Sequence, residues 1–341
     1  MKKSLVLISI FLAVVFIAAG CSSSQTSKNE VAKPESKSAA TTETKQSELK
    51  KVKIAYYGGT CEAPLYTAYE KGFFKEKGLD VELIKVTFDT LKEGIATGKI
   101  DAIQVSAGEL KPIEQGLDIK ITNGVHTGCI QTVVPNNSSI QSIKDLKGKT
   151  IGVEAMGGVP MTLLSIELSK NGIDPKTDVT WKVFPAPQLA LVLEKGEIDA
   201  FGTWDPFGQL ALNDQKVRRL FSNTHTEPYS NMYCCFIGLN GKLVKNDPAT
   251  AKAITEAIQA GGVWVEKNPQ EAAKLAIDKK YTGGDVTTSG ELLHEYTFTS
   301  DTAKAKESLA FYFNGLKEQK ILDPSTDPQL LLENTFVDLY K

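Results

Sequence analysis

Gly98-Lys99-Ile100-Asp101-Ala102 and Gly196-Glu197-Ile198-Asp199-Ala200 are two versions of one junction, about 100 residues apart. Each ends a helical pattern and enters a short apolar strand pattern. Glycine can close the helix in a left-handed conformation, and isoleucine then begins a buried strand. Convergent helix-stop chemistry could produce so short a repeat. Because each copy lies at the same point of a run of alternating strands and helices, the repeat instead favours two lobes of related α/β architecture.

Two sets of short strands surround these junctions. The first set is predicted at 52–56, 81–84, 101–105 and 119–121, and the second at 150–153, 179–183, 198–201 and 218–221. After about residue 241 the pattern becomes helical, with amphipathic helices predicted at 248–267, 269–279 and 301–319. Ligands of such folds bind at the carboxyl ends of the strands, so we expect the site in the crevice between the lobes.

The composition is that of an ordinary globular chain. Hydrophobic residues make up 41% and charged residues 23%, and the formal net charge is −2. No basic surplus points to a nucleic-acid partner, and no apolar run after the first residues points to further membrane spans. From Val52 the folded part runs about 290 residues, which is enough for two lobes.

Lys2 and Lys3 precede an apolar run from Leu5 to Ile17, and Ala18-Ala19-Gly20 precede Cys21. This pattern resembles a bacterial lipoprotein export signal, with Ala18 where that signal usually has leucine. A membrane-spanning anchor is the alternative, but spanning needs roughly 18 or more apolar residues and this run is shorter. We predict that 1–20 is a signal peptide and that Cys21 carries the lipid.

The segment 21–51 is predicted to be a lipidated cysteine followed by a flexible linker. Between 22 and 49, Ser, Thr, Lys, Glu and Gln dominate, and large apolar side chains are almost absent. Such a segment buries too little surface to offset the entropy of ordering. The mature protein would then lie on the extracytoplasmic face of the cell membrane, held there by the lipid at Cys21.

Several further motifs follow one another along 52–341. They are Ala63-Pro64-Leu65-Tyr66-Thr67-Ala68-Tyr69-Glu70-Lys71-Gly72-Phe73-Phe74, Ile143-Lys144-Asp145-Leu146-Lys147-Gly148-Lys149, Thr203-Trp204-Asp205-Pro206-Phe207 and Asn268-Pro269-Gln270-Glu271-Ala272. Their order and spacing resemble the substrate-binding proteins of ABC importers in the nitrate/sulfonate/taurine family. The resemblance implies a two-lobed α/β fold of periplasmic-binding-protein type II, which closes on a small-molecule ligand and delivers it to a membrane permease and its ATPase.

The same template implies the limits of the lobes. Lobe one would comprise 52–126 plus 235–341, and lobe two 127–234. The two crossing hinge segments would lie near 126–134 and 227–235. We expect a monomer that needs no cofactor.

Four loops should meet at the crevice: 58–61, 106–109, 125–129 and 156–162. In the last loop, Gly157 and Gly158 permit close backbone approach, so free N–H groups at a helix start could bind an anion. An ordinary helix-capping loop is the alternative. Trp204 could stack on a ligand, or it could be a buried structural residue. The predicted ligand contacts are Thr60, Cys61, Ser106, His126, Thr127, Cys129, Met156, Gly157, Gly158, Val159, Trp204, Asp205, Tyr233 and Cys234.

Arginine is scarce. Arg218 and Arg219 are the only two in the chain, and both lie outside these loops. No guanidinium fork is therefore available to clamp a carboxylate or sulfonate, and an anion would depend on helix N-termini, hydroxyls or lysine. This weakens a sulfonate or taurine assignment.

Sulfur atoms, which are soft metal ligands, are concentrated in the predicted cleft loops and crossings. The residues that carry them are Cys61, Cys129, Cys234, Cys235, Met156, Met161 and Met232, and His126 lies three residues before Cys129. Four cysteines in an exported protein could form disulfides, in three possible pairings, or pack as small apolar groups. They could also line an organic-ligand pocket or coordinate a soft metal, although the spacing matches no zinc pattern.

The leading hypothesis is a binding protein for a small organic ligand, possibly anionic or sulfur-containing, that works by hinge closure. A receptor for a soft metal or metal complex is one alternative. An enzyme resembling pyrimidine-forming proteins of thiamine biosynthesis is another, because Tyr233-Cys234-Cys235-Phe236 is a partial likeness to their cysteine-rich motif. Those proteins are cytosolic and use a lysine-bound cofactor, so the export signal argues against an enzyme, as does the lack of a convincing catalytic motif.

Overall fold

A computed structural model describes residues 48–341. The predicted signal peptide, Cys21 and the linker up to residue 47 lie outside the described residues. Strand β1 (Lys50–Tyr56) starts two residues before Val52, where the folded part was predicted to begin, and so includes the last two residues of the predicted linker. Within 48–341, no helix combines the length and apolar character needed to cross a bilayer.

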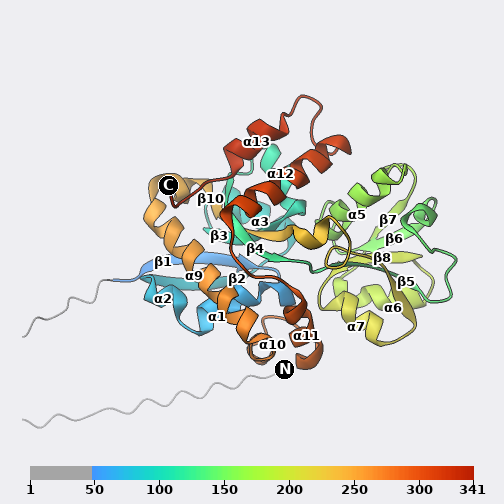
Figure 1. Ribbon diagram of the computed structural model, residues 1–341, viewed down its shortest axis with the longest axis horizontal. Coiled ribbons are helices and arrows are strands. Elements are labelled where there is room, and N and C mark those ends of the chain that lie inside the picture. The colour runs from blue at the N-terminus through green and yellow to red at the C-terminus, as the bar shows by residue number, and fades with distance from the viewer. Residues whose placement is uncertain (1–47) are drawn as a thin grey trace, which may run out of the picture. The chain divides into compact units, whose positions relative to one another are not determined.

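The described residues contain two five-stranded sheets (Figure 1). The first has the order β2 (Leu79–Lys85), β1, β3 (Ala102–Ser106), β10 (Tyr233–Asn240) and β4 (Ile119–Thr127). The second has the order β7 (Thr180–Val183), β6 (Thr150–Val153), β8 (Ala200–Trp204), β5 (Ile130–Pro135) and β9 (Val217–Ser222). In each sheet the fourth strand, β10 or β5, is antiparallel to both of its neighbours. The two sheets therefore share one topology.

The repeated junctions enter equivalent strands, β3 and β8, each third in its sheet. Gly98 and Gly196 have φ angles of 70° and 72°, the left-handed conformation expected of them. Asp101 and Asp199 each accept a 2.8 Å hydrogen bond from a backbone N–H of the neighbouring strand. The sequence repeat therefore corresponds to the same helix-to-strand connection in both lobes.

Helices cover both sheets. Around the first lie α1 (Ala63–Glu70), α2 (Phe73–Glu76), α3 (Phe88–Ala96), α4 (Leu110–Glu114), α8 (Gly241–Asn246), α9 (Pro248–Lys267), α10 (Pro269–Asp278), α11 (Val286–Glu295), α12 (Thr302–Glu318) and α13 (Pro328–Thr335). Around the second lie α5 (Val159–Lys170), α6 (Leu189–Glu194) and α7 (Phe207–Asn213). The three predicted amphipathic helices correspond to α9, α10 and α12. Helices α11 and α13 were not predicted, and each begins at an aspartate N-cap.

The passages between the sheets differ from the predicted crossings: the first is shorter, and the second begins four residues earlier and ends three residues earlier. Strand β4 runs on to Thr127, β5 begins at Ile130, and β10 begins at Tyr233. The chain therefore passes between the sheets only at 128–129 and 223–232. All eight residues of β10 are buried, so no alternation of apolar and polar residues marks this strand in the sequence.

Candidate ligand-binding site

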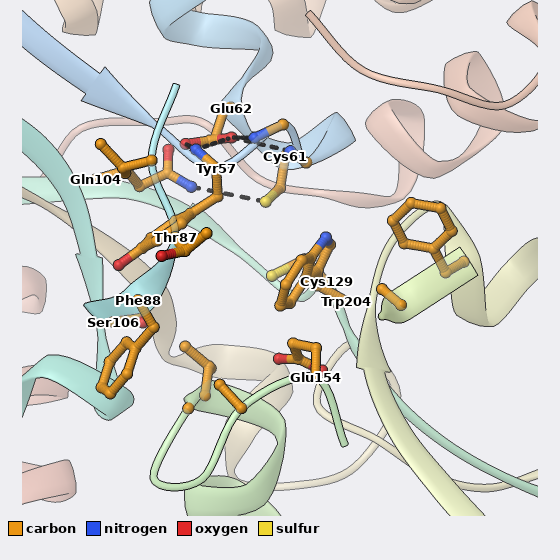
Figure 2. A pocket seen from close by; sticks show the side chains of 18 of the residues that line it. Tyr57, Cys61, Glu62, Thr87, Phe88, Gln104, Ser106, Cys129, Glu154 and Trp204 are labelled. Carbon is orange, nitrogen blue, oxygen red and sulfur yellow. Dashed lines mark hydrogen bonds between the residues drawn. The ribbon is translucent and has the colours of Figure 1, made fainter. Parts of the chain in front are cut away.

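A cavity of about 460 Å³ lies between the sheets, at the carboxyl ends of β1, β3, β6 and β8 (Figure 2). This is where the α/β pattern predicts a site. Both lobes and the first crossing contribute to its wall. The lining residues are Tyr57, Gly58, Gly59, Cys61, Glu62, Lys85, Val86, Thr87, Phe88, Asp89, Gln104, Ser106, Glu109, Cys129, Ile130, Glu154, Ala155, Gly158, Val159, Pro185, Ala186, Pro187, Trp204, Phe207, Cys235 and Gly283.

Glu62 organises the loop after β1. Its carboxylate accepts hydrogen bonds from the backbone N–H groups of Tyr57, Gly58 and Gly59, at 2.7 to 3.1 Å, and from the Tyr66 hydroxyl at 2.9 Å. Burial raises the pKa of Glu62 to about 7, although the backbone donors act in the opposite direction. These bonds hold the loop that presents Cys61 to the cavity.

Glu109 is a second buried acid in the wall. It accepts bonds from the backbone and hydroxyl of Ser106, at 2.9 and 2.7 Å, and from the Tyr57 hydroxyl at 2.7 Å. Burial raises its pKa. Ser106 lies on the cavity wall, but its hydroxyl already donates to Glu109 within the protein.

Glu154 and Trp204 face the cavity without polar partners (Figure 2). Both carboxylate oxygens of Glu154 and the indole Nε1 of Trp204 are buried, and none has a hydrogen-bond partner among the described residues. Burial raises the pKa of Glu154 well above its ordinary value. Unsatisfied buried polar groups cost free energy, so a ligand that pairs with these atoms would recover it.

The N-terminus of α5 is the predicted anion seat. Gly158 and Val159 line the cavity, while Gly157 donates its N–H to the Met161 sulfur at 3.1 Å. Gly108 of lobe one packs directly onto this turn, since a Cβ added there would lie 2.9 Å from the Val159 nitrogen. The helix start is therefore covered by the opposite lobe and shares its cavity with the Glu154 carboxylate.

Asp205 joins the lobes instead of lining the cavity. Gln131 donates to its Oδ1 at 2.7 Å, and the Tyr296 hydroxyl donates to its Oδ2 at 2.5 Å. The Asp205 carbonyl also accepts a 3.2 Å bond from the backbone of Thr60. Burial raises the pKa of Asp205 to about 7, partly offset by the two side-chain donors. Because Tyr296 follows α11 and Asp205 follows β8, we call the Asp205–Tyr296 bond the interlobe latch.

The structure places the predicted contacts in two groups. Cys61, Ser106, Cys129, Gly158, Val159 and Trp204 line the cavity. Eight others do not line it, namely Thr60, His126, Thr127, Met156, Gly157, Asp205, Tyr233 and Cys234. Tyr233, for example, is buried in the first lobe, with its hydroxyl bonded to the Thr299 carbonyl. Met156 is 55% exposed.

Several lining residues were not named among the predicted contacts, chiefly Tyr57, Glu62, Glu109, Glu154 and Cys235, although Glu109 lies in a loop expected at the crevice and Cys235 was one of the four cysteines considered for it. Glu154 directly follows β6, and an acid at the carboxyl end of a predicted strand is a signal that could have identified it. Cys235, not its neighbour Cys234, reaches the cavity, because successive side chains of a strand point to opposite faces.

Four soft or basic donors meet beside the cavity. The ligand atoms of Cys61, His126, Cys129 and Cys235 lie within 4.8 Å of one another, and all four residues are buried. The cysteines are free thiols, and the Cys129 and Cys234 sulfurs are 3.5 Å apart. Hydrogen bonds from the Cys129 and Cys235 thiols hold the pKa of Cys61 well below its usual range.

Two sheets of one topology, joined by two crossings around a cavity, define a two-lobed solute-binding protein of the periplasmic type. Residues 45–277 match the model of the NMT1-like family, and the chain belongs to that family. The predicted resemblance and fold class are thereby confirmed.

Known relatives agree with this class. A Bacillus subtilis protein named for binding aliphatic sulfonates is 28% identical over 99% of this chain and 96% of its own length. A nitrate/nitrite binding protein of Nostoc is 28% identical over 69% of this chain, which spans only 58% of that relative. A Haemophilus influenzae protein named for thiamine biosynthesis is 26% identical over 67% of this chain and 73% of its own length.

The solved structures include the alkanesulfonate-binding protein of Xanthomonas axonopodis pv. citri bound to MOPS. It superposes with a TM-score of 0.71 at 16% identity, covering 85% of this chain and 99% of its own. This likeness supports the fold.

Proposed function

We propose that the chain is the extracytoplasmic substrate-binding component of an ABC importer, which captures a small organic solute between its lobes and delivers it to a membrane permease and its ATPase. The observation that carries the proposal is the cavity whose wall is built by both lobes. The names of the sulfonate- and nitrate-binding relatives support the same role. The proposal assigns binding, without a catalytic step.

The charge of the wall selects the solute class. Four acids line the cavity: Glu62 and Glu109 are buried, Glu154 is half-buried with both carboxylate oxygens buried, and Asp89 is exposed. Among the described residues that line it, Lys85 is the only basic one. Neither arginine lines the cavity: Arg219 donates to Gln131 and Gln209, and Arg218 donates to the Ile140 carbonyl. We therefore propose a solute that carries a cationic or N–H-rich group toward Glu154, and not the anion considered from the sequence.

Aromatic groups complete the complementarity. Tyr57, Phe88, Trp204 and Phe207 line the same cavity. Aromatic faces attract cations and pack well against planar rings. A small nitrogenous, partly aromatic solute would satisfy both the unpartnered carboxylate of Glu154 and the apolar wall.

We propose that the protein exchanges between an open and a closed conformation, and that solute binding favours the closed one. The proposed moving bodies are the two lobes, with their limits moved from the predicted ones so that Thr127, Tyr233 and Cys234 stay with the first sheet. Solute contacts from both lobes, together with the interlobe latch, favour the closed state and shift its population. We further propose that the protein acts as a monomer, anchored by the lipid at Cys21 and the linker 21–51.

A thermal-shift screen with two panels tests the solute class, because true ligands raise the melting temperature by mass action. One panel contains amines, amidines and nitrogen heterocycles, and the other contains nitrate, alkanesulfonates and carboxylates. We expect hits in the first panel. Calorimetry then compares Glu154→Gln with Lys85→Gln.

For a cationic solute, Glu154→Gln should weaken binding by about 10-fold or more, the loss of a charged hydrogen bond. Lys85→Gln is the opposite-charge control and should preserve or strengthen binding. Tight binding of nitrate or a sulfonate, lost in Lys85→Gln and kept in Glu154→Gln, would refute the proposed solute class while leaving the transport role intact.

A further inference from the structure

We propose that Cys61, His126, Cys129 and Cys235 form a binding site for one thiophilic metal ion such as Zn²⁺ at the inner end of the cavity. The four donor atoms lie within 4.8 Å of one another. A tetrahedral Zn²⁺ with bonds of about 2.3 Å to sulfur and about 2.0 Å to nitrogen needs donors somewhat closer than this limit. Small side-chain rotations provide that change.

The donors come from separate parts of the chain. Cys61 lies in the 3-10 turn Thr60–Glu62, His126 near the end of β4, Cys129 in the first crossing, and Cys235 in β10. Their convergence explains why the spacing matches no zinc pattern. An ion bound here would tie the first crossing to the first sheet.

The histidine is oriented for coordination. Its Nδ1 lies 3.0 Å from the Thr127 carbonyl, a contact that requires a proton on Nδ1. The lone pair is then on Nε2, which leaves this nitrogen as the ligand atom that His126 can offer to the cluster. Donation of the remote imidazole N–H to a carbonyl is the usual support of a metal-binding histidine.

Gln104 supports the same orientation. Its amide Nε2 lies 3.2 Å from Nε2 of His126 and 3.6 Å from the sulfur of Cys61. A single amide therefore donates toward both lone pairs that a metal ion would use. An apolar role for the thiols does not account for an imidazole and an amide directed at them.

The donor set defines the class of metal. Three sulfurs and one imidazole suit Zn²⁺ and related thiophilic ions, and do not suit Mg²⁺ or Ca²⁺, which prefer oxygen. Cys61, Cys129 and Cys235 also line the cavity. The ion would therefore form part of the cavity floor, whichever solute the protein captures.

Titration of reduced, metal-free protein with Co²⁺, followed by Zn²⁺ displacement, tests the site. We expect one equivalent of Co²⁺ to produce the intense absorption of tetrahedral thiolate coordination and Zn²⁺ to abolish it. Cys235→Ser should weaken binding by more than about 100-fold, since loss of an outer-shell partner alone costs up to that much. Cys234→Ser is the comparison variant. Cys234 lies outside the set of four, although its sulfur is 3.5 Å from that of Cys129. Because serine can still form a hydrogen bond there, this variant should weaken binding by less than about 10-fold.

Circular dichroism and thermal unfolding of the metal-free variants separate lost ligands from lost folding. If Cys235→Ser does not fold, Cys61→Ser replaces it in the comparison. Wild-type affinity in folded Cys235→Ser, or no stoichiometric binding by wild type with all thiols reduced, would overturn the site. A Cys129–Cys234 disulfide in protein isolated from the cell envelope, with no metal bound, would also overturn it. Solute binding by the metal-free protein is measured separately, so either proposal can fail alone.

Discussion

Replacing Tyr296 by phenylalanine removes the donor of the interlobe latch while keeping the ring. The hydroxyl donates to Oδ2 of Asp205 at 2.5 Å, and both residues are buried. Among residues 48–341, Gln131 is then the only remaining side-chain donor to that carboxylate. A hydrogen bond to a charged group contributes about 1.5–3 kcal/mol to stability, and a neutral one about 0.5–1.5 kcal/mol. The loss should therefore depend on whether Asp205 is ionised.

The direction of the pH effect follows from the pKa of Asp205. Burial raises it to about 7 in the folded protein, above an unfolded value of about 3.9. The folded state thus holds this proton more tightly, so the contribution to stability is fully present below the unfolded pKa and is lost as pH rises through about 7. Tyr296 lowers this pKa, and its removal extends the loss to higher pH. The deficit of Tyr296→Phe should grow from about 0.5–1.5 kcal/mol near pH 5 to about 1.5–3 kcal/mol near pH 8.

Urea unfolding of both proteins near pH 5 and near pH 8 measures this difference. Tyr281→Phe is the matched control, because that hydroxyl donates at 2.7 Å to Glu70, whose pKa is lowered by Lys279 and Tyr281. Glu70 stays ionised across the range, so the control should lose similar stability at both pH values. A pH-independent deficit in Tyr296→Phe would refute the ionisation argument.

Three further experiments test the fold and the anchor. Gly108→Ala brings a Cβ within 2.9 Å of the Val159 nitrogen, whereas the Cβ of the control Gly283→Ala meets open space. Small-angle scattering should show a larger radius of gyration for Gly108→Ala than for wild type, and no change for Gly283→Ala. Equal radii for Gly108→Ala and wild type would contradict the close packing of Gly108 on α5. Gly98→Ala and Gly196→Ala should each destabilise by about 1–2 kcal/mol through left-handed strain, and a large inequality would argue against equivalent junctions. Cys21→Ser should release the protein from membranes on fractionation; retention would exclude lipid anchoring.

The strand and helix pattern was sufficient to predict two α/β lobes, because periodicity and helix-stop residues act locally. Gly98 and Gly196 are read directly from the chain, and both adopt the expected conformation. Strand β10 was not predicted, because it is buried along its whole length and lies between two antiparallel neighbours inside a sheet. That position depends on a segment returning from the other lobe, which no local pattern records.

The candidate site was predicted by loop and not by side chain. Cys61, Cys129 and Trp204 line the cavity as expected. Cys61 lies in the turn after β1, Cys129 in the first crossing, and Trp204 at the end of β8. Asp205 was expected to contact ligand, but Gln131 and Tyr296 bind it instead. Its role depends on a partner about 90 residues away, and only the packing of the lobes brings the two together.

The sequence by itself determined the two-lobe architecture, the family and the set of loops around the cavity, because these follow from local conformational preferences and from the order of motifs. Only the tertiary structure decided which side chains face the cavity, and so its charge. Glu154 is an ordinary acid in the sequence, but burial without a partner makes it a candidate determinant of specificity. Likewise, four donors scattered over some 170 residues become a single cluster, because coordination depends on distances in space that spacing along the chain does not encode.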